Sequence, residues 1–113
     1  MKKTNATFAD FLKLDMRAGQ IKSAIPVEGS NKLLELTVDL GEDYGVVTIL
    51  SGIAKYVNPA ELIEKKVPVV ANLEPKAMAG KFSNGFILMA DLPDHVPSLI
   101  YLDSQVPCGT ILC

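Results

Sequence analysis

The chain has 113 residues, of which 49% are hydrophobic, and its 13 acidic and 11 basic side chains give a formal charge of −2. This length predicts a single domain over residues 1–113, and the apolar content excludes disorder over most of it. The slight acidic excess argues against an indiscriminate nucleic-acid binder, because non-specific affinity comes largely from neutralised phosphates, but it allows a local basic face.

Nothing in the composition indicates a membrane, secreted or metal-binding protein. Residues 1–5 are not followed by the apolar segment of a signal peptide, and no run approaches the about 18 apolar residues of a membrane helix. We therefore expect a cytoplasmic protein with no membrane partner. Cys108 and Cys113 are too few for a disulfide framework, and His95 is the only histidine, so we expect no metal and no cofactor.

The chain opens with a helical segment and a first strand. Residues 7–13 read as one or two helical turns that Thr7 can cap, and residues 1–7 are expected to be flexible. Residues 14–25 then alternate loosely between apolar and polar side chains. Gly19 stands within this strand at a place where the backbone can bulge or bend.

The clearest strand is residues 33–40. Every second side chain in it is apolar, which places one face in the core: Leu34, Leu36, Val38 and Leu40. Residues 41–45 form a turn flanked by glycines, and residues 46–50 return as the second strand of a hairpin.

The second half of the chain adds a short helix and two strands. Asn58 can cap a helix that has Pro59 at its first position. Apolar continuity predicts buried strands at residues 67–71 and 86–90, with a Pro- and Gly-containing loop between them. Five strands interrupted by one short helix predict an all-β fold, the five-stranded OB-fold barrel, whose strand face and loops bind oligonucleotides.

The carboxyl-terminal third contains apolar pieces that a five-stranded barrel does not need. Prolines break it into short extended segments, such as residues 99–102 and 110–113. Additional strands of this kind at a chain end usually cover the core or pair across a subunit boundary. They therefore predict a symmetric homodimer.

No catalytic motif is recognisable. Ser51 lacks the paired glycines of a nucleophile elbow, and His95 lies in a proline-rich loop without a suitable partner. Neither of the glycine-rich phosphate-binding motifs occurs. The residues therefore predict a binding module and not an enzyme.

Lysines fall at the ends of the predicted strands. They are Lys32 before the strand 33–40, Lys55 after the strand end at Ser51, and Lys76 and Lys81 on either side of the loop 78–80. On one side of a barrel, lysines would contact phosphates, while hydroxyl, amide, aromatic or thioether groups would contact bases and 2′-hydroxyls. The alternatives are that each lysine is a solvated surface charge and that Met78 and Phe82 belong to the core.

Segments spread over most of the chain resemble the free-standing tRNA-binding OB-fold proteins related to the carboxyl-terminal domain of bacterial methionyl-tRNA synthetase. In chain order they are Phe8-x-x-Phe11-x-Lys13-x-Asp15-x-Arg17-x-Gly19-x-Ile21, Asn31-Lys32-Leu33-Leu34-x-Leu36-x-Val38-Asp39-Leu40-Gly41, Ser51-Gly52-Ile53-Ala54-x-Tyr56, Pro59-x-Glu61-Leu62, Val70-Ala71-Asn72-Leu73-x-Pro75, Met78-x-Gly80-x-x-Ser83-x-Gly85-Phe86-x-Leu88-x-Ala90 and Val106-Pro107-x-Gly109-Thr110. The chain is also similar to the secretion chaperone CsaA and to tRNA-binding modules of the endothelial-monocyte-activating polypeptide type.

The resemblance implies a non-catalytic homodimer that recognises tRNA by its shape and acts in trans with an aminoacyl-tRNA synthetase. Residues 8–15 and the carboxyl-terminal strands would hold the dimer together. The positions implied for tRNA contact, with Lys55 and Lys81 added from the strand-end pattern, are Lys32, Ser51, Lys55, Asn72, Lys76, Met78, Lys81 and Ser83. The chain begins and ends with this domain, which favours a free-standing protein.

Departures from the family pattern remove positive charge. Residues 46–50 contain no basic side chain, the turn 42–45 is about two residues longer than usual, and Glu74 and Ala79 stand where Lys or Arg is common. Loss of about three cations would weaken binding to tRNA substantially at cellular salt. The alternative function is a CsaA-like secretion chaperone or a peptide-binding module on the same fold, although residues 51–54 favour the tRNA-binding branch.

Overall fold

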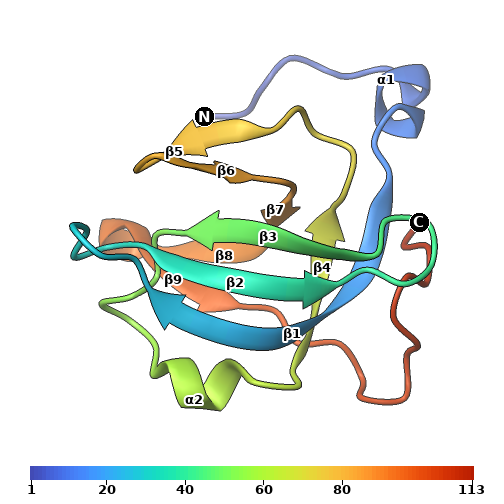
Figure 1. Cartoon of the computed structure of the whole chain (residues 1–113). Helices are drawn as coiled ribbons and strands as arrows, with labels where there is room; N and C mark the ends of the chain where they lie inside the picture. Colours follow the sequence, from blue (N-terminus) through green and yellow to red (C-terminus); the bar gives the residue numbers. More distant parts are fainter.

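The computed structural model describes residues 1–113, and a curled, five-stranded antiparallel sheet forms its body (Figure 1). The strands lie in the order β3-β2-β1-β4-β7, so that β3 and β7 are the two edges. Their bounds are β1 Met16–Pro26, β2 Leu34–Asp39, β3 Val46–Ser51, β4 Lys66–Val70 and β7 Phe86–Ile87. The sheet is a half-barrel of the all-β, OB-like class, as the sequence predicts.

The core follows from the alternation along β2. Leu34, Leu36 and Val38 are buried, while the side chains between them are partly exposed. They pack with aliphatic side chains of the neighbouring strands, chiefly Ile21, Ile49, Val67, Val69 and Ile87. Each fully buried side chain of this kind contributes roughly 1.5–3 kcal/mol, so this interior is the main source of stability.

Gly19 serves the packing of the barrel and does not form the predicted bulge. The register of β1 against β2 shifts between Ile21 and Ser23, two residues later in the strand. A Cβ atom on Gly19 would lie 2.6 Å from Val38 Cγ1 and 3.0 Å from Leu40 Cδ2. Gly19 is therefore present because core side chains of the β2 segment occupy the space where its own side chain would be.

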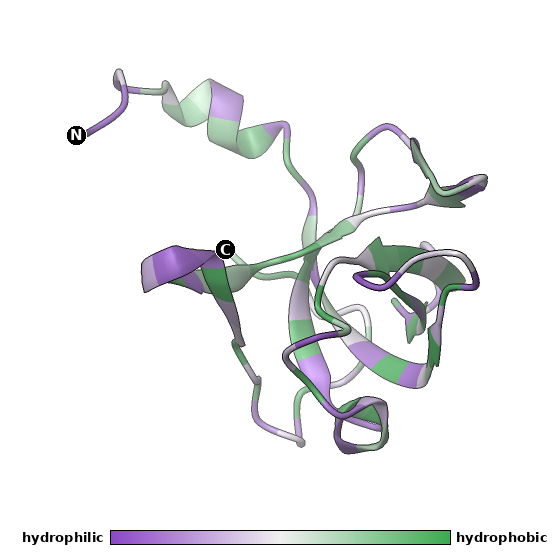
Figure 2. Cartoon of the chain, turned by 90° about the vertical axis from the view of Figure 1, so that its left-hand side faces the viewer, coloured by the Kyte–Doolittle hydropathy of each residue, from purple (hydrophilic) through white to green (hydrophobic).

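Two short helices begin at the predicted caps. In α1, Phe8–Leu12, the Thr7 hydroxyl accepts a hydrogen bond of 3.1 Å from the backbone N–H of Asp10. In α2, Pro59–Leu62, Asn58 accepts one of 3.1 Å from Ala60 N–H. α2 packs against β1, whereas α1 stands away from the body of the molecule (Figure 2). No helix is both long and apolar enough to cross a membrane.

The loop predicted between residues 71 and 86 contains a hairpin of its own. Its strands are β5, Lys76–Met78, and β6, Lys81–Ser83. Ala79 and Gly80 between them have φ values of 50° and 79°. Two consecutive residues with positive φ match the twist of a tight hairpin. The expectation of an irregular loop was wrong because strands of three residues leave no periodic signal.

The predicted strand 86–90 is also divided. It separates at Leu88 into β7 and β8, Met89–Leu92, and β8 then pairs with β9, Val96–Leu99, around the 3-10 turn η1, Pro93–His95. The segment 110–113 lies along β1, where Ala18 N–H donates to Thr110 C=O at 2.9 Å and Ile111 pairs with Arg17. The flexibility expected of residues 1–7 stays a prediction.

Candidate nucleic-acid interface

The β5–β6 hairpin is fastened to the free edge of β3. The hydroxyl of Ser83, a residue only 5% exposed, accepts a hydrogen bond of 3.0 Å from Leu50 N–H. The next residue, Asn84, donates its backbone N–H to Thr48 C=O at 2.8 Å. These two bonds hold the hairpin beside the seam between the edge strands β3 and β7.

A cavity of about 500 Å³ lies under the hairpin. Its walls come mainly from the end of β3, the β5–β6 hairpin and β7. The lining residues are Ile49, Leu50, Ser51, Gly52, Leu73, Glu74, Lys76, Met78, Ser83, Gly85, Phe86 and Ile87. Four predicted contact residues, Ser51, Lys76, Met78 and Ser83, therefore come together here from separate parts of the sequence.

A second cavity, of about 370 Å³, continues the first toward the β8–β9 hairpin. The two cavities share Ser51, Gly52, Phe86 and Ile87, so we treat them as one trough. Met89, Asp91, His95 and Pro97 line its far end. Sequence reasoning missed Gly52 and Phe86 as lining residues, and it missed the part played by the β8–β9 hairpin.

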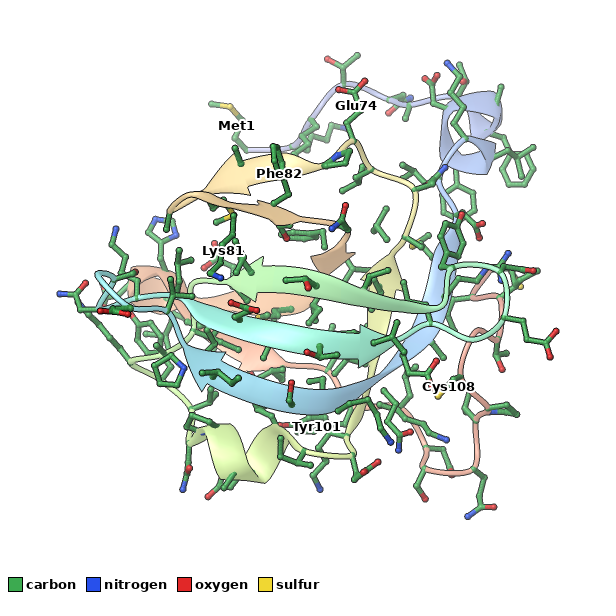
Figure 3. All side chains as sticks on the ribbon, viewed as in Figure 1. Met1, Glu74, Lys81, Phe82, Tyr101 and Cys108 are labelled. Atoms are coloured by element: carbon green, nitrogen blue, oxygen red, sulfur yellow. The ribbon has the colours of Figure 1, made fainter.

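The two faces of the β5–β6 hairpin differ in their surroundings. Lys76 and Met78 line the trough, and Lys81 Nζ lies 3.2 Å from Glu35 Oε1 on β2. Phe82 projects from the opposite face of the hairpin and lines neither cavity (Figure 3). The pairing with Glu35 offsets part of the positive charge that Lys81 was expected to offer.

Lys32 and Lys55 lie outside the trough, on two loops that are joined to each other. Ala54 N–H donates to Lys32 C=O at 2.9 Å, and Leu34 pairs with Ser51 where β2 and β3 meet these loops. The backbone therefore places both lysines on loops next to Ser51, which lines both cavities.

Asn72 makes structural contacts with both atoms of its amide. Its Oδ1 accepts from Asp15 N–H at 2.8 Å, and its Nδ2 donates to Lys13 C=O at 2.7 Å. These bonds fasten the link between α1 and β1 to the end of β4. Asn72 does not line the trough, so its contribution to a binding surface would be indirect.

An ionic network that the sequence did not indicate occupies the same end of β1, at its start. Arg17 contacts Asp15 through Nε at 2.7 Å and Asp43 through Nη1 at 2.8 Å, and the Tyr44 hydroxyl donates to Asp15 at 2.6 Å. The hydrogen bond from Arg17, followed by that from Tyr44, holds the pKa of Asp15 below its ordinary value. Arg17 is thus engaged in structural contacts. No three His, Cys, Asp or Glu side chains come together as a metal site.

Residues 16–111 match the family described as "Putative tRNA binding domain". The chain belongs to this tRNA-binding domain family. This membership confirms the resemblance drawn from the sequence segments, and it makes the trough and the lysines beside it the natural candidate for the interface.

Known relatives carry the same domain in two settings. The chain is 42% identical to a methionine–tRNA ligase of Streptococcus pneumoniae over 99% of its own length, and 46% identical to one of Clostridium tetani over 96%, but it spans only 17% of each. Among solved structures, the MetRS-related protein of Pyrococcus horikoshii is 33% identical with a TM-score of 0.91, with 98% of this chain and all of that one covered. The chaperone CsaA of Bacillus anthracis is 29% identical with a TM-score of 0.86, covering 97% of this chain and all of its own.

Removal of the Ser83 hydroxyl should weaken the fold. Ser83→Ala leaves the N–H of Leu50 without its partner in a buried place, which costs about 1–3 kcal/mol of unfolding free energy. Urea unfolding followed by circular dichroism measures this change. Ser104→Ala is the control, because that side chain is exposed and only its backbone oxygen forms a hydrogen bond. Equal stability of the two variants would contradict the role of Ser83 in fastening the β5–β6 hairpin to β3.

Proposed function

We propose that this chain is a non-catalytic tRNA-binding protein whose contact surface is the trough together with the lysine-bearing loops beside it. The observation that carries the proposal is the gathering of Ser51, Lys76 and Met78 in one cavity of a tRNA-binding domain. Lys32 and Lys55 extend this surface on the neighbouring loops. Recognition by shape follows, because cations placed at several points along a curved surface select the path of a phosphate backbone.

The geometry of the trough supports binding and not bond chemistry. Ser51 and His95 both line its second cavity, but the hydrogen-bond partner of His95 is Asp91, at 3.2 Å, and not the serine hydroxyl. A hydroxyl nucleophile needs a base within hydrogen-bond reach to become reactive. The family matched by the chain is likewise a binding module.

We further propose a homodimer that forms through the segment 8–15 and the carboxyl-terminal strands. α1 has five residues and buries none of them, and Phe8 and Leu12 are largely exposed. Isolated helices shorter than about 12–15 residues are marginal in water. Burial of this apolar face against a second copy would supply the stability that α1 lacks.

The physiological partner we propose is an aminoacyl-tRNA synthetase in the cytoplasm, which this chain would assist in trans. The support is the occurrence of the same domain as 17% of the length of methionine–tRNA ligases. A domain that holds tRNA raises the effective concentration of the substrate near the enzyme it accompanies.

A second candidate is a peptide-binding chaperone on the same surface. The apolar side chains of the trough, such as Ile49, Leu73 and Met78, and the likeness to CsaA support it. The two functions differ in their salt dependence, because phosphate contacts release counterions and apolar contacts do not.

Binding to bulk tRNA should be salt-dependent with a modest slope. Three available lysines, Lys32, Lys55 and Lys76, predict that the logarithm of the affinity falls with the logarithm of salt with a slope between about −2 and −3. Lys76→Glu and Lys32→Glu should each weaken binding about tenfold and reduce the slope by about 1. Gel shifts or fluorescence anisotropy over a salt series measure both quantities.

The matched control is Lys22→Glu, which makes the same charge change on β1 at a residue paired with Glu64 and absent from the trough. It should leave affinity within about twofold, because exposed ion pairs away from an interface contribute little. Absence of tRNA binding at about 50 mM salt would refute the function. Equal losses in Lys22→Glu and Lys76→Glu would refute the site.

The dimer should depend on the exposed face of α1. Sedimentation of the wild type at micromolar concentration should give the mass of two chains, and Phe8→Asp should give one, because a carboxylate in an apolar contact is costly to desolvate. Phe82→Asp is the control at another largely exposed aromatic, on the β5–β6 hairpin, and should remain dimeric. A strictly monomeric wild type would contradict the proposal.

A further inference from the structure

Phe86 is the aromatic side chain at the junction of the two cavities. It lines both of them and is 55% exposed, although its neighbour Ile87 is buried in the core. The alternation of a strand explains this difference, since successive side chains point to opposite faces. Phe86 is therefore held by the short strand β7 as an open aromatic surface in the middle of the trough.

The groups around Phe86 differ in the two directions. Ser51 lines both cavities, whereas Lys76 and Glu74 lie only toward the β5–β6 hairpin, together with apolar side chains. Toward the β8–β9 hairpin about half of the lining residues are hydrophobic, as in the first cavity, and the charged or titratable groups are Asp91 and His95, which contact each other. A phosphate is favoured at the first end only, whereas a flat, uncharged group is accommodated along the apolar centre.

We propose that Phe86 stacks on an unpaired base of the bound tRNA, with the phosphate of that nucleotide at Lys76. This inference rests on the proposed tRNA-binding function and specifies its ligand as an unstacked nucleotide, recognised in addition to the overall shape. An aromatic ring, an ammonium group and a hydroxyl in one trough match the base, the phosphate and the 2′-hydroxyl of such a nucleotide.

Glu74 fits the same ligand. A carboxylate in this cavity repels a phosphate, but it accepts a hydrogen bond from the exocyclic amino group of a base. The substitution of an acidic residue where the family often carries a cation would then favour a base edge at that position.

The experiment compares Phe86 with a second exposed phenylalanine. Phe86→Ala should weaken binding of bulk tRNA about 5- to 150-fold while the salt slope stays unchanged, because stacking releases no counterions. Phe86→Trp should retain or restore the affinity. Phe82→Ala, at a side chain that is 63% exposed and lines neither cavity, should leave the affinity unchanged. Circular dichroism and urea unfolding confirm that each variant is folded.

A second measurement addresses the kind of nucleotide. Wild-type protein should prefer a short single-stranded RNA over a fully paired RNA duplex of the same length, and Phe86→Ala should lose that preference. Wild-type affinity in Phe86→Ala, while the wild type binds tRNA, would overturn this inference and leave the proposed function standing. If Phe86→Ala loses binding to an apolar extended peptide and keeps its affinity for tRNA, the result would overturn the inference in favour of a peptide ligand. A wild type that binds no tRNA refutes the proposed function itself.

Discussion

The hydrogen bond from Leu50 N–H to the Ser83 hydroxyl holds the β5–β6 hairpin, which forms one wall of the proposed binding surface. A five-stranded sheet in the order β3-β2-β1-β4-β7 has two free edges, and each edge exposes backbone groups that require partners. Ser83 and Asn84 satisfy part of the β3 edge and at the same time hold the β5–β6 hairpin beside the seam. The trough exists because the β5–β6 hairpin covers one part of the seam between β3 and β7 and leaves the end near Ser51 and Gly52 open.

Part of the positive charge of the chain is used within the structure. Several cations contact carboxylates or backbone carbonyls and so contribute little to a phosphate-binding face: Arg17 with Asp15 and Asp43, Lys22 with Glu64, Lys81 with Glu35, and Lys66 with the carbonyls of Ser104 and Val106. With a net charge of −2 and a single lysine lining the trough, the domain cannot rely on electrostatics alone. In the proposed function, the half-exposed aromatic ring of Phe86 supplies a non-electrostatic contact.

Local patterns in the sequence were sufficient to predict the regular parts of the fold. The alternation of β2 and the caps at Thr7 and Asn58 depend on neighbours in the chain, and the structure confirms each of them. Gly19 was misread because its cause lies in another part of the chain, whereas the hairpin at residues 76–83 was missed because strands of three residues leave no periodic signal. Gly19, for example, is required by side chains about twenty residues away.

The candidate site was only partly predictable for the same reason. The motif residues Ser51, Lys76 and Met78 line one cavity, and their contact with tRNA stays a prediction. A motif does not distinguish a contact residue from one that shapes the site. Asn72 and Ser83 come from two such motifs, and both use their side chains in hydrogen bonds within the protein. Phe86 was read as the start of a strand, since only its place between two cavities shows that its ring is accessible.

A titration of isotopically labelled protein with tRNA, followed by backbone amide resonances at low salt, tests the central claim most directly. The account predicts that the largest changes cluster at Ser51, Gly52, Lys76 and Phe86, with smaller ones on the loops of Lys32 and Lys55. Changes confined to the opposite side, around Lys22, Glu64 and α2, would contradict the assignment of the trough as the tRNA-binding surface.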